Sequence, residues 1–446
     1  PPGDRTNCVN SRPLMKNTLL FFLLIAGLCS QPVLARISPG SWRGALQLND
    51  STDLPFLFEV RFEKDVPLIT IHNGKEDILI SEITQKGDSI SWKIPVVMAE
   101  FHCLIKNKQE LEGFWINYEI EGVKRIRFTA TLGKQNRFVI PKTTLPQKNI
   151  AGNWKVIFKS ANKDSIPAQG IFSQEGSVLS GTFQTERGDY RYMEGYVSGN
   201  RFRLMGFDGS HAFVFAGTVS DNEKIKGEFW FGAHNYLTWR AEKNATYKLT
   251  DPQRITFMID TTDRVYFSFY NSEGQSVSLS DERYMGKVVI IQLMGSWCPI
   301  CIDESKTLKA FYTQYNAKGL EIVALDYEKM RNPVKARENA KRFKTQLDLP
   351  YEVLITGRGN YGSAHANFPQ LNNVTAFPTT LYLDKTGKVR NIYTGFSGPA
   401  TGAKYVSALS ASASKRARAA TAWTPSPVVG DSRSRASNGA ASRAAS

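Results

Sequence analysis

The chain has 446 residues, of which 41% are hydrophobic and 22% charged. This composition is globular, with enough length for two or three domains, and it excludes a disordered or fibrous protein. Lys and Arg number 56 against 41 Asp and Glu, a net charge of +15, but nearly half of this excess lies at the two ends of the chain. The rest is spread thinly, so we expect no nucleic-acid partner.

The start of the chain indicates an export signal. Met15 is the first plausible start, so we treat residues 1–14 as an upstream non-native or extra segment. A positive charge after Met15, an apolar run over residues 19–28 and a small-residue cleavage site are typical of a secretory signal peptide. We assign it to residues 15–35, with Arg36 starting the mature chain. The alternative is a membrane anchor, but the run is shorter than the ~20 apolar residues needed to span a bilayer.

Residues 36–145 and 146–250 form two predicted β units. Short alternating runs such as residues 56–60 are separated by Gly, Asn and Asp turns. The second unit repeats the first, since the Gly-x-Trp sequence at Trp42 recurs at Trp154. We therefore predict two all-β repeat units, each barrel-like or a sandwich. The Gly-x-Trp openings resemble the start of lipocalin-like barrels, in which the Trp closes one end of the barrel.

Aromatic side chains are frequent in both units, and Trp residues stand at positions 42, 92, 115, 154, 230 and 239. They form either the core of each unit or the lining of a ligand cavity, and we favour the core. Cys103 lies in a predicted strand, where an unpaired Cys is usually a small buried apolar residue.

After residue 251 the pattern changes to alternating strands and helices. Strands are expected over residues 288–293, 320–325 and 351–355, with helices over 299–316 and 333–347 and a hairpin joining 379–383 to 389–393. This alternation predicts an α/β domain with a parallel sheet core over residues 251–405. Of the 41 residues in 406–446, 22 are Ala or Ser, so we expect a disordered low-complexity tail there, with a basic interaction arm as the alternative.

A Cys-Pro-Ile-Cys motif joins the first of these strands to the first helix. Cys298 would lie at the helix N-terminus, where free N–H groups and the helix dipole favour the thiolate that attacks a disulfide. The spacing lets Cys301 reach back to resolve the mixed disulfide. Zinc binding would need further ligands that the local sequence lacks, so we expect no metal; a purely structural disulfide is the other alternative.

Three motifs together suggest a family. Residues 295–301, the Phe377-Pro378 dipeptide before two Thr, and the 384–388 turn resemble the thioredoxin-like thiol-disulfide oxidoreductases of the bacterial envelope, the TlpA-like group. The resemblance covers about residues 277–405. It implies that Pro378 is a cis proline beside the dithiol and that Phe377 presents its backbone to the substrate.

The resemblance also implies roles for two further side chains. We assign Trp297, together with Phe377 and Pro378, to substrate binding. Glu304 matches the acidic residue that this group carries after the motif, whereas Gln292 stands where thioredoxins have a titratable Asp. We expect Glu304 to accept the proton of Cys301; alternatively, it only complements the helix dipole.

The leading functional hypothesis is a thiol-disulfide oxidoreductase of the periplasm or cell envelope. It would reduce disulfide-bearing envelope proteins through Cys298 and Cys301, with electrons from a membrane electron-donor protein and without a cofactor. The alternative is a ligand- or protein-binding β protein with a passive thioredoxin-like module.

Overall fold

The computed structural model describes residues 36–118, 124–133, 136–140, 145–160, 164–232, 235–259 and 261–407. The expected upstream segment, signal peptide and nearly all of the expected tail lie outside these residues. The first two residues of that tail, Val406 and Ser407, belong to a short helical stretch that the structure describes from residue 403 to 407. In the part of the chain that is described, no helix is long and apolar enough to cross a membrane.

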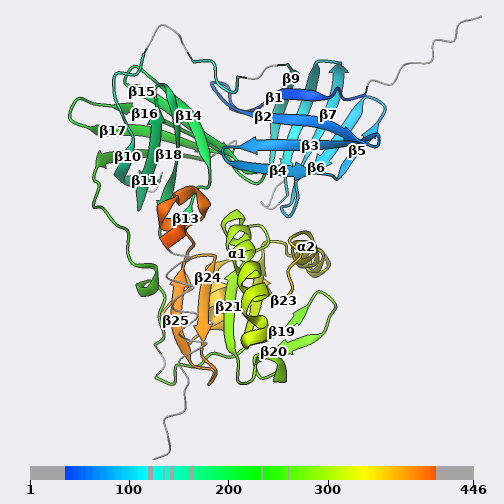
Figure 1. The fold of residues 1–446 in the computed structure, drawn as a ribbon, viewed down its shortest axis with the longest axis vertical. Helices are drawn as coiled ribbons and strands as arrows, with labels where there is room; N and C mark the ends of the chain where they lie inside the picture. Colours follow the sequence, from blue (N-terminus) through cyan, green and yellow to red (C-terminus); the bar gives the residue numbers. More distant parts are fainter. Residues whose placement is uncertain are drawn as a thin grey trace, which may run out of the picture. The chain divides into compact units, whose positions relative to one another are not determined.

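The first β unit is a nine-stranded antiparallel sheet that forms a barrel, shown in blue and cyan in Figure 1. Strand β1 pairs with β2 on one side and with β9 on the other, so the last strand returns to the first. The strands are β1 (Gly40–Asn49), β2 (Thr52–Glu63), β3 (Val66–Asn73), β4 (Glu76–Ile80), β5 (Ile83–Lys86), β6 (Ser89–Lys93), β7 (Ala99–Asn107), β8 (Glu110–Asn117) and β9 (Lys124–Leu132).

The second β unit repeats this topology. Strand β10 pairs with β11 and with the last strand, β18, and an additional pairing of β11 with β12 closes the barrel. The strands are β10 (Gly152–Lys159), β11 (Ser165–Glu175), β12 (Val178–Thr185), β13 (Gly188–Asp189), β14 (Met193–Ser198), β15 (Arg201–Phe207), β16 (Ala212–Val219), β17 (Lys224–Phe231) and β18 (Asn235–Lys243).

The sequence repeat has a direct structural counterpart. Trp42 and Trp154 are the third residues of β1 and β10, and both are buried. In each, the indole Nε1 donates a hydrogen bond to a backbone carbonyl four residues upstream, Ser38 at 3.0 Å and Ile150 at 2.8 Å. A large apolar ring with a satisfied N–H fits the closed end of a barrel. The predicted pair of barrel-like units is therefore confirmed.

Aromatic rings fill both barrels. In the second, Phe215 stacks on Phe229 with ring centroids 3.9 Å apart, and Phe183 stacks on Phe215 at 4.3 Å. Five of the six Trp residues noted in the sequence are at most 3% exposed, and the sixth, Trp230, is partly buried. The core interpretation of these residues is confirmed. The Cys103 thiol is free and buried, and burial raises its pKa.

The last part of the chain is a mixed α/β domain with a seven-stranded sheet of order β20-β19-β23-β22-β21-β24-β25. Strands β21, β22 and β23 are parallel, and β24 and β25 add an antiparallel edge. The strands are β19 (Ser268–Asn271), β20 (Ser276–Ser278), β21 (Val288–Met294), β22 (Leu320–Glu328), β23 (Glu352–Arg358), β24 (Thr379–Leu383) and β25 (Val389–Thr394). The helices are α1 (Pro299–Tyr315), α2 (Pro333–Gln346) and α3 (Tyr361–Asn367).

Most of these elements agree with the sequence prediction. All seven residues of β21 are buried, which explains its unbroken apolar run, because a central parallel strand is covered on both faces. After α1 a short 3-10 turn ends at Gly319, whose φ of 92° is the left-handed conformation that glycine adopts without a Cβ clash. The β19–β20 hairpin and α3 were not predicted, since elements of three to seven residues carry little periodicity.

Candidate active site

The two cysteines lie at the start of α1. Cys298 is the N-cap residue, and Pro299 follows in the first turn, where a missing N–H costs no helical hydrogen bond. The Cys298 Sγ accepts a hydrogen bond from the backbone N–H of Cys301 at 3.3 Å, and the two residues form a disulfide. Cys301 is fully buried, whereas Cys298 is 8% exposed. Cys298 is therefore the more accessible of the two cysteines.

The helix N-terminus supplies the electrostatics that this position needs. The N–H groups of the first turn lack helical partners and carry the positive end of the helix dipole. When the disulfide is reduced, the Cys301 N–H that already faces the Cys298 Sγ stabilises a thiolate there. The geometry thus favours an outer nucleophilic sulfur and a protected inner one.

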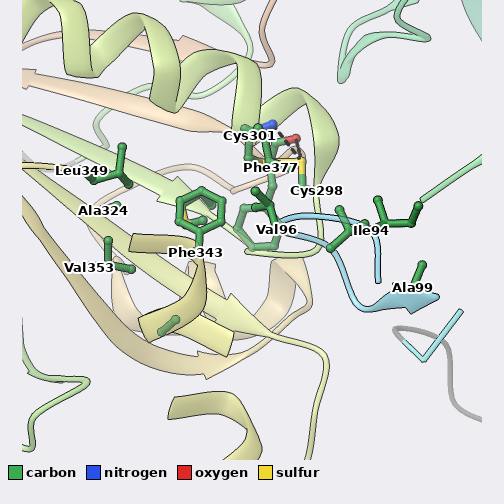
Figure 2. Close-up of a cluster of buried hydrophobic side chains, with 14 of the residues drawn as sticks. Ile94, Val96, Ala99, Cys298, Cys301, Ala324, Phe343, Leu349, Val353 and Phe377 are labelled. Atoms are coloured by element: carbon green, nitrogen blue, oxygen red, sulfur yellow. Dashed lines mark hydrogen bonds between the residues drawn. A yellow bond between two sulfur atoms is a disulfide. The ribbon is translucent and has the colours of Figure 1, made fainter. Parts of the chain in front are cut away.

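The Phe377-Pro378 segment faces the dithiol across the active site. Its peptide bond is cis, as the resemblance implied. The Phe377 carbonyl oxygen lies 3.7 Å from the Cys298 Sγ, and Figure 2 shows this contact beside the two yellow sulfurs. The Phe377 ring stacks on Tyr327 and meets Trp297 edge-on, with centroids 5.3 and 6.1 Å apart. The three residues assigned to substrate binding therefore lie together around Cys298.

Glu304 is buried beneath the motif, at 4% exposure. Its carboxylate accepts hydrogen bonds from the Thr380 hydroxyl on β24 and from Nε2 of Gln292 on β21, each at 2.9 Å. The same Gln292 Nε2 donates to the Cys301 carbonyl at 3.4 Å. The side chain of Glu304 thus points into the domain toward the resolving cysteine, not toward solvent at the helix end.

Asp303, the neighbouring acid on α1, has a different environment. It pairs with the Arg191 guanidinium of the second β unit at 3.0 Å, and Arg191 also pairs with Glu76 of the first unit. Burial raises the pKa of Asp303, and the positive charge of Arg191 opposes this shift. No local motif indicates this ion pair, because its partners are far apart along the chain.

Sequence patterns did not identify several other residues near the dithiol. The Lys329 ammonium lies 3.8 Å from the centroid of the Trp297 ring, and the Arg187 guanidinium lies 5.2 Å from that of Tyr361. Val96 of the first β unit belongs to the same buried cluster as Cys298, as Figure 2 shows. Each contact joins separate chain segments, so no local motif could have revealed it. Within the described ranges, no group of His, Cys, Asp and Glu is arranged to hold a metal ion.

The fold and this dithiol define a class of protein. Residues 256–409 match the Redoxin family model. This part of the chain is thus a redoxin domain of the thioredoxin-like class with a Cys-x-x-Cys pair, related to the thiol-disulfide oxidoreductases.

Individual relatives agree with this assignment. The domain is 32% identical over 117 residues to the thiol-disulfide oxidoreductase ResA of Bacillus thuringiensis subsp. konkukian, covering 26% of this chain and 59% of ResA. It is 28% identical over 129 residues to the thioredoxin-like protein YneN of Bacillus subtilis, covering 29% of this chain and 68% of YneN. The chain thus spans less than two thirds of the length of ResA.

A solved structure is also similar. A thiol-disulfide oxidoreductase from Bacteroides fragilis is 20% identical, and the match covers 32% of this chain and 96% of that one with a TM-score of 0.25.

Proposed function

We propose that this protein is a thiol-disulfide oxidoreductase that reduces disulfides of cell-envelope proteins. One observation carries the proposal: Cys298 caps α1, accepts the Cys301 N–H and forms a disulfide with Cys301 inside a redoxin domain. A purely structural disulfide would not need its outer cysteine at a helix N-terminus beside the Phe377 backbone carbonyl. The 3.7 Å contact with the Phe377 carbonyl supports a site at which a substrate chain docks.

The proposed reaction has two exchange steps. In the reduced protein, the Cys298 thiolate attacks one sulfur of the substrate disulfide, so a mixed disulfide forms and the second substrate sulfur leaves as a thiolate that takes up a proton. Cys301 then loses its proton and attacks the Cys298 Sγ. The mixed disulfide breaks, the first substrate sulfur leaves, and the Cys298–Cys301 disulfide remains. Two electrons pass from the protein dithiol to the substrate.

The surrounding residues have separate proposed roles. Phe377, held by the following Pro378, offers its backbone to the substrate chain, and Trp297 provides an apolar contact beside the attacking sulfur. Glu304 accepts the Cys301 proton in the second step, with Gln292 between the carboxylate and the cysteine backbone.

We also propose where the protein acts and what reduces its disulfide after each turnover. We infer export to the periplasm or cell envelope from the expected signal peptide. Each turnover leaves the dithiol oxidised, so a dithiol donor must reduce it again, and we propose a membrane electron-donor protein for this step. No cofactor is needed, because thiol chemistry alone balances the electrons.

Trapping tests the proposal. The full chain with Cys301→Ala should accumulate mixed disulfides with envelope proteins, because the resolving thiol is missing. Cys298→Ala is the matched control and should trap few, since Cys301 is buried. The unaltered chain should speed the reduction of insulin by dithiothreitol. No acceleration, or equal trapping by both variants, would favour the alternative in which a binding β protein carries a passive thioredoxin-like module.

A further inference from the structure

Two buried carboxyl groups hold the residue that lies two positions before Cys298. Asp326 and Glu328 end strand β22, and because they are two residues apart their side chains lie on the same face of the sheet. The Asp326 Oδ1 accepts the backbone N–H of Ser296 at 2.9 Å, and the Glu328 Oε1 accepts the Ser296 hydroxyl. Ser296 is 1% exposed, so both contacts are protected from water.

These contacts fix the turn that carries the nucleophile. The backbone N–H of Cys298 donates to the Gly295 carbonyl at 3.0 Å, which closes a four-residue turn around Ser296 and Trp297. The Trp297 indole N–H donates to the Tyr327 carbonyl at 2.8 Å, so the end of β22 also holds the other central residue of the turn. The position of the Cys298 sulfur therefore depends on the end of β22.

The available donors do not satisfy two ionised carboxylates. Asn339 on α2 donates to the Glu328 Oε2 at 3.1 Å, but the Asp326 Oδ2 is buried and accepts no hydrogen bond from any described group. The two carboxyls both bind Ser296, through its N–H and its hydroxyl, and the Asp326 carboxyl interacts electrostatically with that of Glu328. Two carboxyl groups can share a hydrogen bond only when one of them carries a proton.

The electrostatics agree with this geometry. Burial first, and then the charge of Glu328, raise the pKa of Asp326 well above its usual range, while the Ser296 N–H partly opposes the shift. Glu328 is the acidic group that acts on Asp326. Ser296 and Asn339 are neutral donors, and the Thr356 hydroxyl on β23 donates to the Asp326 backbone carbonyl. A like charge beside a buried carboxyl disfavours its ionised form, so Asp326 holds its proton strongly.

We propose that Asp326 and Glu328 are positioning residues that share one proton and, in that state, clamp the turn preceding Cys298. Loss of the proton places two negative charges in a buried site beside the turn, which loosens the Ser296 contacts and disfavours the Cys298 thiolate. This inference builds on the proposed function, since it concerns the nucleophile of that reaction. It differs from the role of Glu304, which lies under the resolving cysteine.

Asp326→Asn and Asp326→Ala separate the parts of this proposal. The Asn side chain keeps an oxygen for the Ser296 N–H and replaces the shared proton with a permanent N–H toward Glu328. Alanine leaves the Ser296 N–H unsatisfied and Glu328 alone. Asp348→Asn, at an exposed surface position, controls for the loss of one negative charge.

The measurement is alkylation of Cys298 by iodoacetamide against pH, in the reduced full chain with Cys301→Ala. The parent should show a second, alkaline inflection beyond that of the thiol, and the Asp348→Asn control should keep it. Asp326→Asn should lose it, and Asp326→Ala should react about tenfold more slowly at neutral pH. Superimposable profiles for the parent and Asp326→Asn, or a parental rate for Asp326→Ala, would overturn the proposal.

A second measurement does not depend on the alanine variant folding. At neutral pH, the infrared difference spectrum of the parent minus Asp326→Asn should contain the carbonyl stretch of a protonated buried carboxyl, because other protonated carboxyls such as Asp189 cancel in the difference. The absence of that band from the difference spectrum would refute the shared proton. Neither readout needs a protein substrate, so failure of this inference is distinguishable from failure of the reductase function.

Discussion

Glu304→Gln tests whether the buried carboxylate accepts the proton of Cys301. Glutamine has nearly the same shape, and both observed contacts can persist. Its carbonyl oxygen accepts from Gln292, and the Thr380 hydroxyl turns to accept from the new amide. The substitution thus removes one charge and the ability to take up a proton while the packing of α1 on β21 and β24 is preserved.

The two interpretations of Glu304 predict different magnitudes. A positioned general base contributes typically about 10²–10⁴-fold to a proton-transfer step, so Glu304→Gln should slow the attack by Cys301 at least about 100-fold at neutral pH. Exchanging a charged for a neutral hydrogen-bond acceptor should cost about 1 kcal/mol of unfolding free energy. If Glu304 only complements the helix dipole, Glu304→Gln should lower the unfolding free energy by about 0.3–1 kcal/mol and leave the rate of attack by Cys301 unchanged.

The assay isolates the second exchange step. A mixed disulfide between Cys298 and a coloured aromatic thiol is prepared in the full chain, and release of the thiol is followed by absorbance across a range of pH. Asp348→Asn is the matched control, because it removes one exposed negative charge that pairs with Lys309 of α1 and it does not touch Gln292. Equal slowing by both variants would indicate a general charge effect, and an unaltered pH–rate profile for Glu304→Gln would remove it from the mechanism.

Three further predictions concern stability. Trp154→Ala should lower the unfolding free energy of the second β unit by about 3–5 kcal/mol in urea titrations, against a much smaller loss for the partly buried Trp230→Ala; equal losses would contradict the assigned core. Burial raises the pKa of Asp189 from its usual 3.8 to about 7. The folded protein therefore holds this proton more tightly than the unfolded chain does, which contributes up to about 4 kcal/mol to the unfolding free energy. The contribution is complete below pH 3.8 and is lost as pH rises through 7. The urea midpoint of the parent should therefore fall relative to that of Asp189→Asn between pH 5 and about 8, and parallel curves would disprove the assignment. Arg191→Met leaves two buried carboxylates without their cation and should cost about 3–5 kcal/mol, which thermal unfolding measures; a parental midpoint would show that the ion pairs contribute nothing.

The sequence alone determined the features that depend on residues close together along the chain. Hydrophobic periodicity, the glycine at 319 and the proline after Cys298 predicted the strands and helices of the redoxin domain within a few residues, because each is governed by neighbours along the chain. The Gly-x-Trp repeat predicted two similar β units for the same reason. The domain boundaries at 145 and 250 stay predictions, as does the signal peptide.

Only the tertiary structure decided which distant side chains meet. The sequence showed that Glu304 follows the motif, but not that Thr380 and Gln292 receive its carboxylate. It contained no sign that Asp326 and Glu328 hold the turn before Cys298. Periodicity indicates which face of an element is buried, whereas the partner on that face is set by strand order, and the order here places β22 and β24 on either side of β21. That arrangement places Gln292 on β21 beside Thr380 on β24, where both receive the Glu304 carboxylate of α1. It also places the acidic pair at the end of β22 beside the turn that follows β21, because the ends of adjacent parallel strands meet at one edge of the sheet.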